Sequence, residues 1–361
     1  MEALKLRGRS ECTFDLLSLG EVLLRFDPGE ERIMQTRHFR VWEAGGEYNV
    51  ARALRRVFGM KTAMVTALVD NPVGRLVEDL MLQGGVNLDH VLWREYDGIG
   101  AEARNGVYFM ERGFGVRNAL GSMDRGHTAI SQLKTGDVDW DAIFATGVRW
   151  FHTGGIFCAL SASTPEVAKE AMQAARRHGA VVSFDCNYRP SLWKAVGGRA
   201  RAAEVNRDLA PYVDVLFGHE GDLALELGAY SYVPPSHTLE TYQEMCERIL
   251  QAHPNFKVIA TTTRRPITAS VNDFGAFGYT EGKAYEAREM RNLDIFDRVG
   301  GGDGFASGVI CGLMEGRSMD WSLNCGVSHG ALTMTTAGDN SFATRGEVER
   351  VMQGGSAGAQ R

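Results

Sequence analysis

Three consecutive glycines followed by an aspartate, at positions 300–303, are the residues of this sequence best suited to do chemistry. Glycine reaches backbone angles that other residues avoid. The run precedes Phe305, Val309 and Leu313, whose four-residue spacing predicts a helix. The first N–H groups of a helix have no partner within it, and the helix dipole is positive there. An anion can therefore bind against the bare backbone of Gly300, Gly301 and Gly302.

Asp303, at the mouth of this anion site, has two interpretations. A carboxylate beside a bound anion could take a proton from a nucleophile that attacks that anion. Aspartate is also a favoured helix cap. Glycine-rich turns before helices are common, so the Gly-Gly-Gly-Asp run taken alone favours the cap.

Composition excludes several classes of protein. The 361 residues include 39 basic and 45 acidic ones, a net charge of -6 without a basic block, which argues against a nucleic-acid partner. Six cysteines without a C-x-x-C pair indicate reduced thiols in a cytoplasmic protein and no zinc site. We find no secretion signal in residues 1–12 and no run of about 20 apolar residues for a membrane span.

Strand and helix patterns alternate along most of the chain. This alternation predicts an α/β fold with three layers, a mostly parallel sheet between two layers of helices. We expect strands at 14–19, 63–69, 150–153, 181–185, 213–217 and 258–262, an added β segment at 274–280, and helices from 49 to 59 and at 73–83, 165–179, 305–313 and 321–335.

Two stretches, 22–45 and 98–122, instead predict extended strands, among them residues 39–43. We expect these strands to be antiparallel and to form a small β-sheet lid over the sheet edge, and the lid either covers a ligand or makes a dimer. No linker divides the chain, so we expect a single domain over 1–361, with a disordered tail at 354–361.

Two motifs carry a family resemblance. The segment Gly45-Gly46-x-x-Asn49-x-Ala51 is similar to the N-terminal signature of the PfkB, or ribokinase-like, carbohydrate kinases. Residues 297–310 resemble their second signature, a Gly-Ala-Gly-Asp-like anion hole with the catalytic aspartate. Two signatures in order, about 250 residues apart on an alternating chain, are more specific than either alone.

Within that family the chain most resembles the 2-keto-3-deoxygluconate kinases. Gly20-Glu21, Tyr108, Asp124-Arg125 and Asp185-x-Asn187-Tyr188-Arg189 all look like theirs. The resemblance implies that Asp303 is the general base of phosphoryl transfer from ATP to a sugar acid, with Mg²⁺ as cofactor and Gly300–Gly302 as the anion hole. The 6-phosphate is the implied product. Separately from the resemblance, an exposed lid sheet would suit a homodimer.

The implied substrate site centres on arginine. A 2-keto-3-deoxy sugar acid carries a carboxylate, which arginine binds with two charge-assisted hydrogen bonds, and Arg125 and Arg189 are the candidates. Each could instead make a surface ion pair. The other implied substrate residues are Gly45, Gly46, Asn49 and Tyr108.

The nucleotide end departs from the family pattern. Its Asn-x-x-Glu motif reads His219-Glu220-Gly221-Asp222, where Asp222 can still hold Mg²⁺ through water. The usual Thr-x-Gly-x-x-Gly turn is replaced by Thr261-Thr262-Thr263-Arg264-Arg265 and a longer loop through Asn272. Arg298 replaces a smaller residue, and Met123 stands where related sugar-acid kinases often have tyrosine. The implied nucleotide residues are Asp222, Thr262, Arg264 and Asn324.

In the family that this chain resembles, the loop before the anion hole is often associated with a monovalent cation such as K⁺. The resemblance therefore implies Asp297 as the ligand of that cation. Two alternatives to the sugar-acid kinase stay open. One is a kinase of a neutral ketose such as fructose or ribose, and the other is a non-catalytic sugar-binding protein of the same fold. A nicotinamide dehydrogenase is excluded because no Gly-x-Gly-x-x-Gly follows the first strand.

Overall fold

The computed structural model of the protein describes residues 4–227 and 238–355. Its main sheet consists of β1 (Phe14–Leu19), β4 (Thr62–Val69), β5 (Val91–Arg94), β8 (Val148–Gly154), β9 (Val181–Asp185), β10 (Val215–Phe217), β11 (Val258–Pro266), β12 (Val271–Thr280), β13 (Lys283–Glu286) and β14 (Met290–Asp294).

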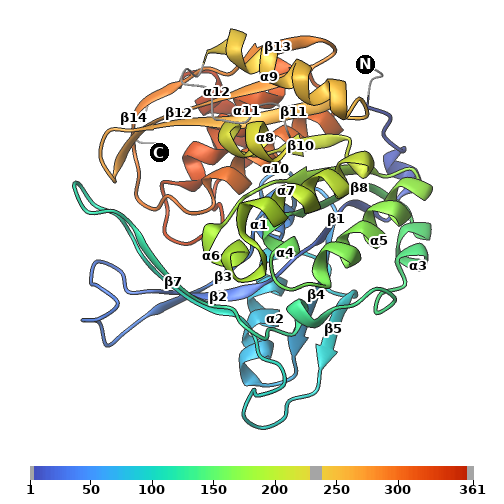
Figure 1. Cartoon of the computed structure of the whole chain (residues 1–361). Coiled ribbons are helices and arrows are strands. Elements are labelled where there is room, and N and C mark those ends of the chain that lie inside the picture. Colours follow the sequence, from blue (N-terminus) through green and yellow to red (C-terminus); the bar gives the residue numbers. More distant parts are fainter. Residues whose placement is uncertain (1–3, 228–237, 356–361) are drawn as a thin grey trace.

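These strands lie in the order β13-β12-β11-β10-β9-β8-β1-β4-β5, with β14 paired to β12 (Figure 1). Neighbours from β11 to β5 are parallel, and β12 runs antiparallel to β11, β13 and β14. The predicted parallel sheet is confirmed. After β1, the main sheet is extended on one side by β4 and β5 and then on the other side by β8 to β11. The strand order therefore reverses next to β1, and a crevice opens there at the carboxyl ends of the strands.

Both faces of the sheet are buried under helices, which is why its strands read as nearly continuous apolar runs. Leu17 and Leu19 of β1 pack into one hydrophobic cluster, and Leu16 packs into the other. The first cluster includes side chains of α3 (Trp140–Ala145), α4 (Gly155–Cys158), α5 (Thr164–Arg177), α6 (Pro190–Trp193), α7 (Gly198–Leu209), α8 (Glu220–Glu226) and α9 (Leu239–Ala252). The second includes α1 (Gly46–Arg56), α2 (Pro72–Gly84), α10 (Gly301–Met314), α11 (Met319–Thr333) and α12 (Arg345–Met352).

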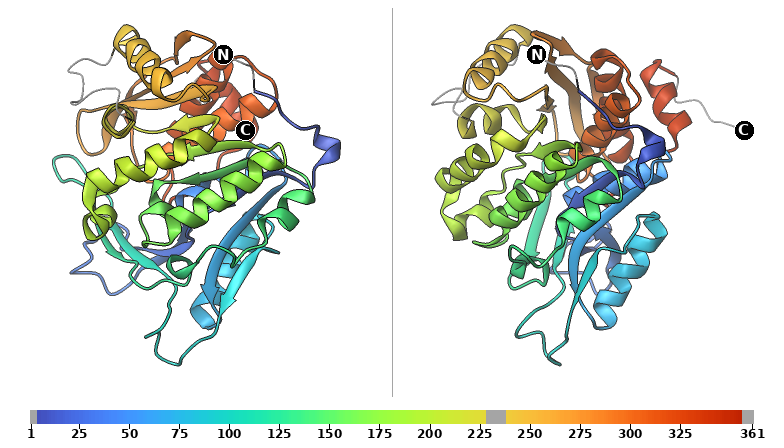
Figure 2. Two further views of the ribbon diagram at one scale, coloured as in Figure 1. Left: turned by 45° about the vertical axis from the view of Figure 1, so that its right-hand side comes forward. Right: turned by 90° about the vertical axis from the view of Figure 1, so that its right-hand side faces the viewer.

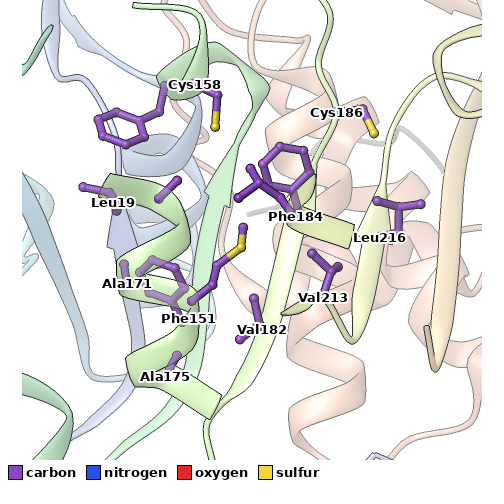
Figure 3. Close-up of a cluster of buried hydrophobic side chains, with 14 of the residues drawn as sticks. Leu19, Phe151, Cys158, Ala171, Ala175, Val182, Phe184, Cys186, Val213 and Leu216 are labelled. Carbon is purple, nitrogen blue, oxygen red and sulfur yellow. The ribbon is translucent and has the colours of Figure 1, made fainter. Parts of the chain in front are cut away.

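The two helical layers lie on opposite sides of the sheet in the right-hand view of Figure 2. On the first face, small side chains of α5 allow close packing. Ala171 and Ala175 lie beside Phe151 of β8 and Val182 of β9, and all four are buried (Figure 3). Short 3-10 helices occur at Arg9–Glu11, Ile130–Gln132, Lys194–Val196 and Ala210–Tyr212.

A second, four-stranded sheet forms the lid, in the order β3 (Arg40–Ala44), β2 (Leu23–Asp27), β6 (Val107–Glu111) and β7 (Leu120–Asp124). It projects to the left in Figure 1. The predicted lid stretches contain these strands, except that β7 runs two residues past 122. The expectation that all lid strands are antiparallel is corrected, because β2 and β6 pair in parallel. Strands β3, β4 and β5 and helices α1 and α2 lie between β2 and β6 in the chain. This long connection allows the two strands to run in parallel, which a tight hairpin would not. A dimer through the lid stays a prediction.

Three local expectations differ from the structure. Helix α1 begins at Gly46, three residues before the predicted start. The longer loop expected after Arg265 and through Asn272 is shorter in the structure, because β11 runs to Pro266 and β12 begins at Val271, and Pro266 pairs with Asn272. Beyond residue 355, the predicted disordered tail lies outside the described residues. Within the described ranges, no helix is both long and apolar enough to cross a membrane.

Candidate active site

A cavity of about 560 Å³ lies where the carboxyl ends of the parallel strands meet the lid and the N-terminus of α10. Most of the predicted site residues line it: Gly45, Gly46, Asn49, Tyr108, Arg125, Arg189, Asp222, Thr262, Arg264, Gly300, Gly302 and Asp303. Gly301, Asp297 and Asn324 are not among the lining residues. Tertiary structure thus brings residues from 45 to 303 into one pocket.

Asp303 lies in the first turn of α10 but does not cap it. The N-cap is Gly300, which has φ of +80° and no side-chain cap. The Oδ2 atom of Asp303 instead accepts a 2.7 Å hydrogen bond from Nδ2 of Asn49. Burial raises the pKa of Asp303 well above its usual value, Asp185 and Asp339 raise it further, and Asn49 and Arg189 lower it. A partly desolvated carboxylate with a raised pKa suits proton abstraction.

The backbone at the predicted anion hole, the start of α10, is open. Among the described residues, the N–H groups of Gly301, Gly302 and Asp303 have no hydrogen-bond acceptor. A Cβ atom at Gly300 would lie 1.9 Å from the backbone oxygen of Asp339, so only glycine fits there. A Cβ atom at Gly302 would have no neighbour within 4 Å. Gly302 therefore presents open backbone to the cavity.

The floor of the pocket is formed by the end of β9 and the start of α1. Gly45 has φ of +154°, and a Cβ atom there would lie 2.1 Å from the backbone oxygen of Glu21. A Cβ atom at Gly46 would lie 3.8 Å from both Oδ1 of Asp303 and Nδ2 of Asn187. Gly45 therefore allows the start of α1 to pack tightly against Glu21, and Gly46 lies beside Asp303 at ordinary contact distance.

Asp185, at the end of β9, lines the same floor and was not predicted as a site residue. Burial raises its pKa to about 6, with a further rise from Asp222, while Arg189 and the backbone N–H of Asn187 lower it. Its place at the carboxyl end of a central parallel strand was the available signal.

The two candidate arginines differ in their partners. Nε of Arg125 donates a 2.6 Å hydrogen bond to Oε2 of the buried Glu21, and its terminal nitrogen contacts the same carboxylate. The carboxyl of Glu47, whose pKa burial raises to about 7, also interacts with Arg125. By contrast, the guanidinium of Arg189 is exposed and has no hydrogen bond or ion pair to a side chain in the described part of the protein. Of these two, only Arg189 offers an uncommitted positive charge.

A second pair of arginines lies beside the anion hole. Arg264, at the end of β11, and Arg298, before the glycines, both line the cavity. Burial lowers the pKa of Arg264 to about 10, and the positive charge of Arg298 lowers it as well. In the described ranges neither arginine forms an ion pair with a carboxylate, so this pair of cations is suited to attract an anion. Thr262 lines the same end of the cavity.

Other predicted residues are already engaged. Oδ1 of Asp222 lies 3.0 Å from Nη1 of Arg199, and His219 caps α8 by accepting from the N–H of Gly221.

The Tyr108 hydroxyl donates to Oδ2 of Asp339. The amide of Asn324 contacts the backbone of Arg288 and Asp320, so the structure does not bring it to the nucleotide end.

Asp297, the expected monovalent-cation ligand, is buried and paired with Arg25. Arg25 also forms an ion pair with Asp339. Neither Arg25 nor Asp339 was predicted as a site residue. A charged residue inside the apolar run of β2 was the signal, since arginine is rarely buried without partners.

Comparisons with known proteins identify the family. The family model described as "pfkB family carbohydrate kinase" matches residues 13–345. The chain belongs to the pfkB family of carbohydrate kinases. Over 350 residues it is 31% identical to the 2-dehydro-3-deoxygalactonokinase of Haloferax volcanii, which covers 97% of this chain and 100% of the relative. A 2-dehydro-3-deoxygluconokinase of Thermoproteus tenax is 27% identical over 337 residues, 92% of this chain and 91% of the relative.

Solved structures agree with this membership. The crystal structure of 2-dehydro-3-deoxygluconokinase from Thermotoga maritima matches with a TM-score of 0.85 and 32% identity, over 94% of this chain and 99% of that one. The pfkB kinase described here is therefore a sugar kinase with the ribokinase-like fold, as the two sequence signatures predicted. The site geometry and these relatives together bear on its substrate.

Proposed function

We propose that this pfkB kinase phosphorylates a 2-keto-3-deoxy sugar acid, 2-keto-3-deoxygluconate in the first instance, on its 6-hydroxyl with MgATP. The observation that carries the proposal is the uncommitted guanidinium of Arg189 in the cavity that contains Asp303. A substrate carboxylate would neutralise it, whereas a neutral ketose would not. The names of the relatives support the same substrate class.

The reaction follows from the residues of the cavity. Asp303 takes the proton of the sugar hydroxyl as its oxygen attacks the γ-phosphorus of ATP. The bond between that phosphorus and the β–γ bridging oxygen breaks, and ADP leaves. The N–H groups at the start of α10 hydrogen-bond the oxygens of the transferred group, and Arg264 and Arg298 neutralise the phosphates.

Asp185 and Asp222 are the residues suited to Mg²⁺. They lie in one cavity, and the negative charge of Asp222 raises the pKa of Asp185, as expected of two neighbouring carboxylates. Mg²⁺ binds through one or two carboxylates together with waters and substrate phosphates, so a larger protein cluster is not required. When bound, the metal supplies positive charge to the β- and γ-phosphates. Asp222 must then share its carboxylate with, or release, Arg199.

Steady-state kinetics with 2-keto-3-deoxygluconate, fructose and ribose tests the proposal. We expect the acid to have the highest kcat/KM. The change Arg189→Ala should lower kcat/KM for the acid roughly 10- to 100-fold, the range of a charged hydrogen bond, and leave the neutral ketoses unaffected. Arg201→Ala, which removes a surface arginine paired with Glu204, is the matched control. If a neutral ketose is preferred and Arg189→Ala has no effect on the acid, the proposal is wrong.

A second candidate substrate is 2-keto-3-deoxygalactonate, the epimer at C4. It is favoured because the 31% identical relative from Haloferax volcanii is named for it. Both epimers have the carboxylate that Arg189 would bind, so Arg189→Ala should affect them equally. The ratio of their kcat/KM values in the parent enzyme distinguishes the two.

A further inference from the structure

Arg25 is a fully buried arginine at the centre of a cluster of carboxylates behind the anion hole. Nη2 of Arg25 lies 2.5 Å from Oδ2 of Asp297, and Nη1 lies 2.7 Å from Oδ1 of Asp339. Asp27 is a third acid, at 3.7 Å. Burial disfavours the charge of Arg25, yet Asp339 and Asp297 raise its pKa above the usual value. The guanidinium is therefore a permanent internal cation.

The partners of Arg25 hold the loop that leads into the anion hole. Asp297 accepts hydrogen bonds from the N–H groups of Val299, through Oδ1, and Gly338, through Oδ2, both at 3.3 Å. The backbone oxygen of Asp339 packs against Gly300, where no Cβ atom would fit. Arg25 thus fixes Asp297 and Asp339, and these two set the backbone that precedes the N–H groups of α10.

The same cluster reaches the lid. Arg25 itself belongs to lid strand β2, and the hydroxyl of Tyr108 on lid strand β6 donates to the second oxygen of Asp339. Tyr108 also lines the cavity. One side chain therefore connects the lid, the wall of the sugar site and the anion-hole loop.

The Asp297 loop does not fit an additional monovalent cation. Such an ion needs oxygen ligands, but both oxygens of Asp297 already accept hydrogen bonds, and the positive Arg25 lies against one of them. A second cation beside a buried guanidinium would be repelled in a medium of low dielectric constant. The positive charge that a bound K⁺ would bring to this loop is already present in the chain.

We propose that Arg25 is a positioning residue that takes the place of a monovalent cation, so that turnover does not depend on K⁺. This inference rests on phosphoryl transfer at Asp303. It does not depend on which sugar is the acceptor, so an error in the proposed substrate leaves it testable with whichever sugar is phosphorylated.

The first experiment uses the intact parent enzyme, prepared with tetramethylammonium as the sole monovalent cation and titrated with KCl at constant ionic strength. We expect kcat to change less than about twofold. Saturable activation by K⁺ of about tenfold or more would mean that K⁺ binding is coupled to turnover, and it would overturn the inference. This test needs no variant and so does not depend on the folding of one.

The second experiment asks whether an added cation replaces the missing side chain. Arg25→Ala should lower kcat by about 100-fold or more, because it leaves buried carboxylates without a partner. Low concentrations of guanidinium, or K⁺, should restore at least about a tenth of the lost rate. Arg25→Lys keeps a positive charge and should stay insensitive to K⁺.

Arg112→Ala is the matched control, because Arg112 lies 3.8 Å from Asp27 and packs on the ring of Phe296 but forms no ion pair with Asp297 or Asp339. It should respond to K⁺ and guanidinium as the parent does. If Arg25→Ala retains the parent kcat, or if added cations raise its Tm without raising kcat, Arg25 does not position the anion hole and the inference is wrong.

Discussion

The side-chain amide of Asn49 donates a 2.7 Å hydrogen bond to the carboxylate of Asp303. The two residues are 254 positions apart, and they meet because the start of α1 packs against the start of α10. The bond ties one carboxylate oxygen of Asp303 to a side chain of α1. It also explains why the aspartate does not cap its own helix.

Removing this hydrogen bond should move the pH dependence of the kinase. Asn49 lowers the pKa of Asp303, so Asn49→Ala should raise that pKa further. The base must be deprotonated to act, and the acidic limb of kcat/KM should therefore shift to higher pH, with about a tenfold loss of rate near neutrality. Asn255→Ala, whose amide binds backbone oxygens of Ala210 and Val213, is the control and should leave the limb in place. An unchanged limb in Asn49→Ala would contradict this account of the base.

Replacement of the base itself separates catalysis from binding. Asp303→Asn keeps the size of the side chain but cannot accept the hydroxyl proton, so kcat should fall by about 10³-fold or more. Calorimetry should still detect binding of the sugar to this variant. Turnover within tenfold of the parent would mean that another group abstracts the proton, whereas loss of both turnover and sugar binding would point to a structural effect.

The same variant should be more stable than the parent at neutral pH. The pKa of Asp303 is raised in the folded protein, so its contribution to stability is fully present below the unfolded pKa of about 3.8 and is lost as pH rises through the folded pKa. The uncharged amide of the Asp303→Asn variant would mimic the protonated carboxyl at every pH. We expect Tm to rise on the order of 1–3 °C at neutral pH and the difference to disappear in acid. An equal Tm difference at all pH values would rule out titration of this carboxyl as its cause.

Two nearby glycines should respond to alanine in opposite ways. Gly300→Ala forces a Cβ atom into the backbone of Asp339 at φ of +80°, and Tm should fall by several degrees or the protein should not fold. Gly302→Ala places its methyl group in open space, so Tm should hold or rise by about 1–2 °C, since alanine is favoured in helices. The kcat of Gly302→Ala should nevertheless fall about 10- to 100-fold, because the methyl group occupies the phosphate side of the backbone. Thermal melts and ADP-release assays on both variants test this pair.

The arginines beside the anion hole should govern nucleotide affinity. The charge of Arg298 contributes to the lowered pKa of Arg264, so Arg298→Ala should relieve that repulsion and leave Tm without nucleotide unchanged or higher. The KM for ATP should rise about tenfold or more and become less sensitive to salt. Arg265→Ala is the control, because this neighbour points outward, is exposed and pairs with Asp273. Equal effects of the two changes on KM would argue against a phosphate role for Arg298.

Local sequence was sufficient to predict the buried strands of this kinase and the glycine-rich start of α10. The positions of the buried strands follow from runs such as residues 63–69, because both faces of a parallel sheet must be apolar. The open backbone at the start of α10 follows from Gly300, Gly301 and Gly302, because the free N–H groups and the needed backbone freedom are properties of those few residues.

The choice of partners was decided only by the tertiary structure. Sequence treated Arg125 and Arg189 alike, but the fold places Glu21 against one and leaves the other uncommitted. It also brings Arg25 to Asp297 and Asp339, 272 and 314 positions away, where the sequence suggested a monovalent cation. An arginine's residue type sets its charge, but what that charge does depends on which carboxylates the packed chain places within reach, and no local pattern encodes that distance.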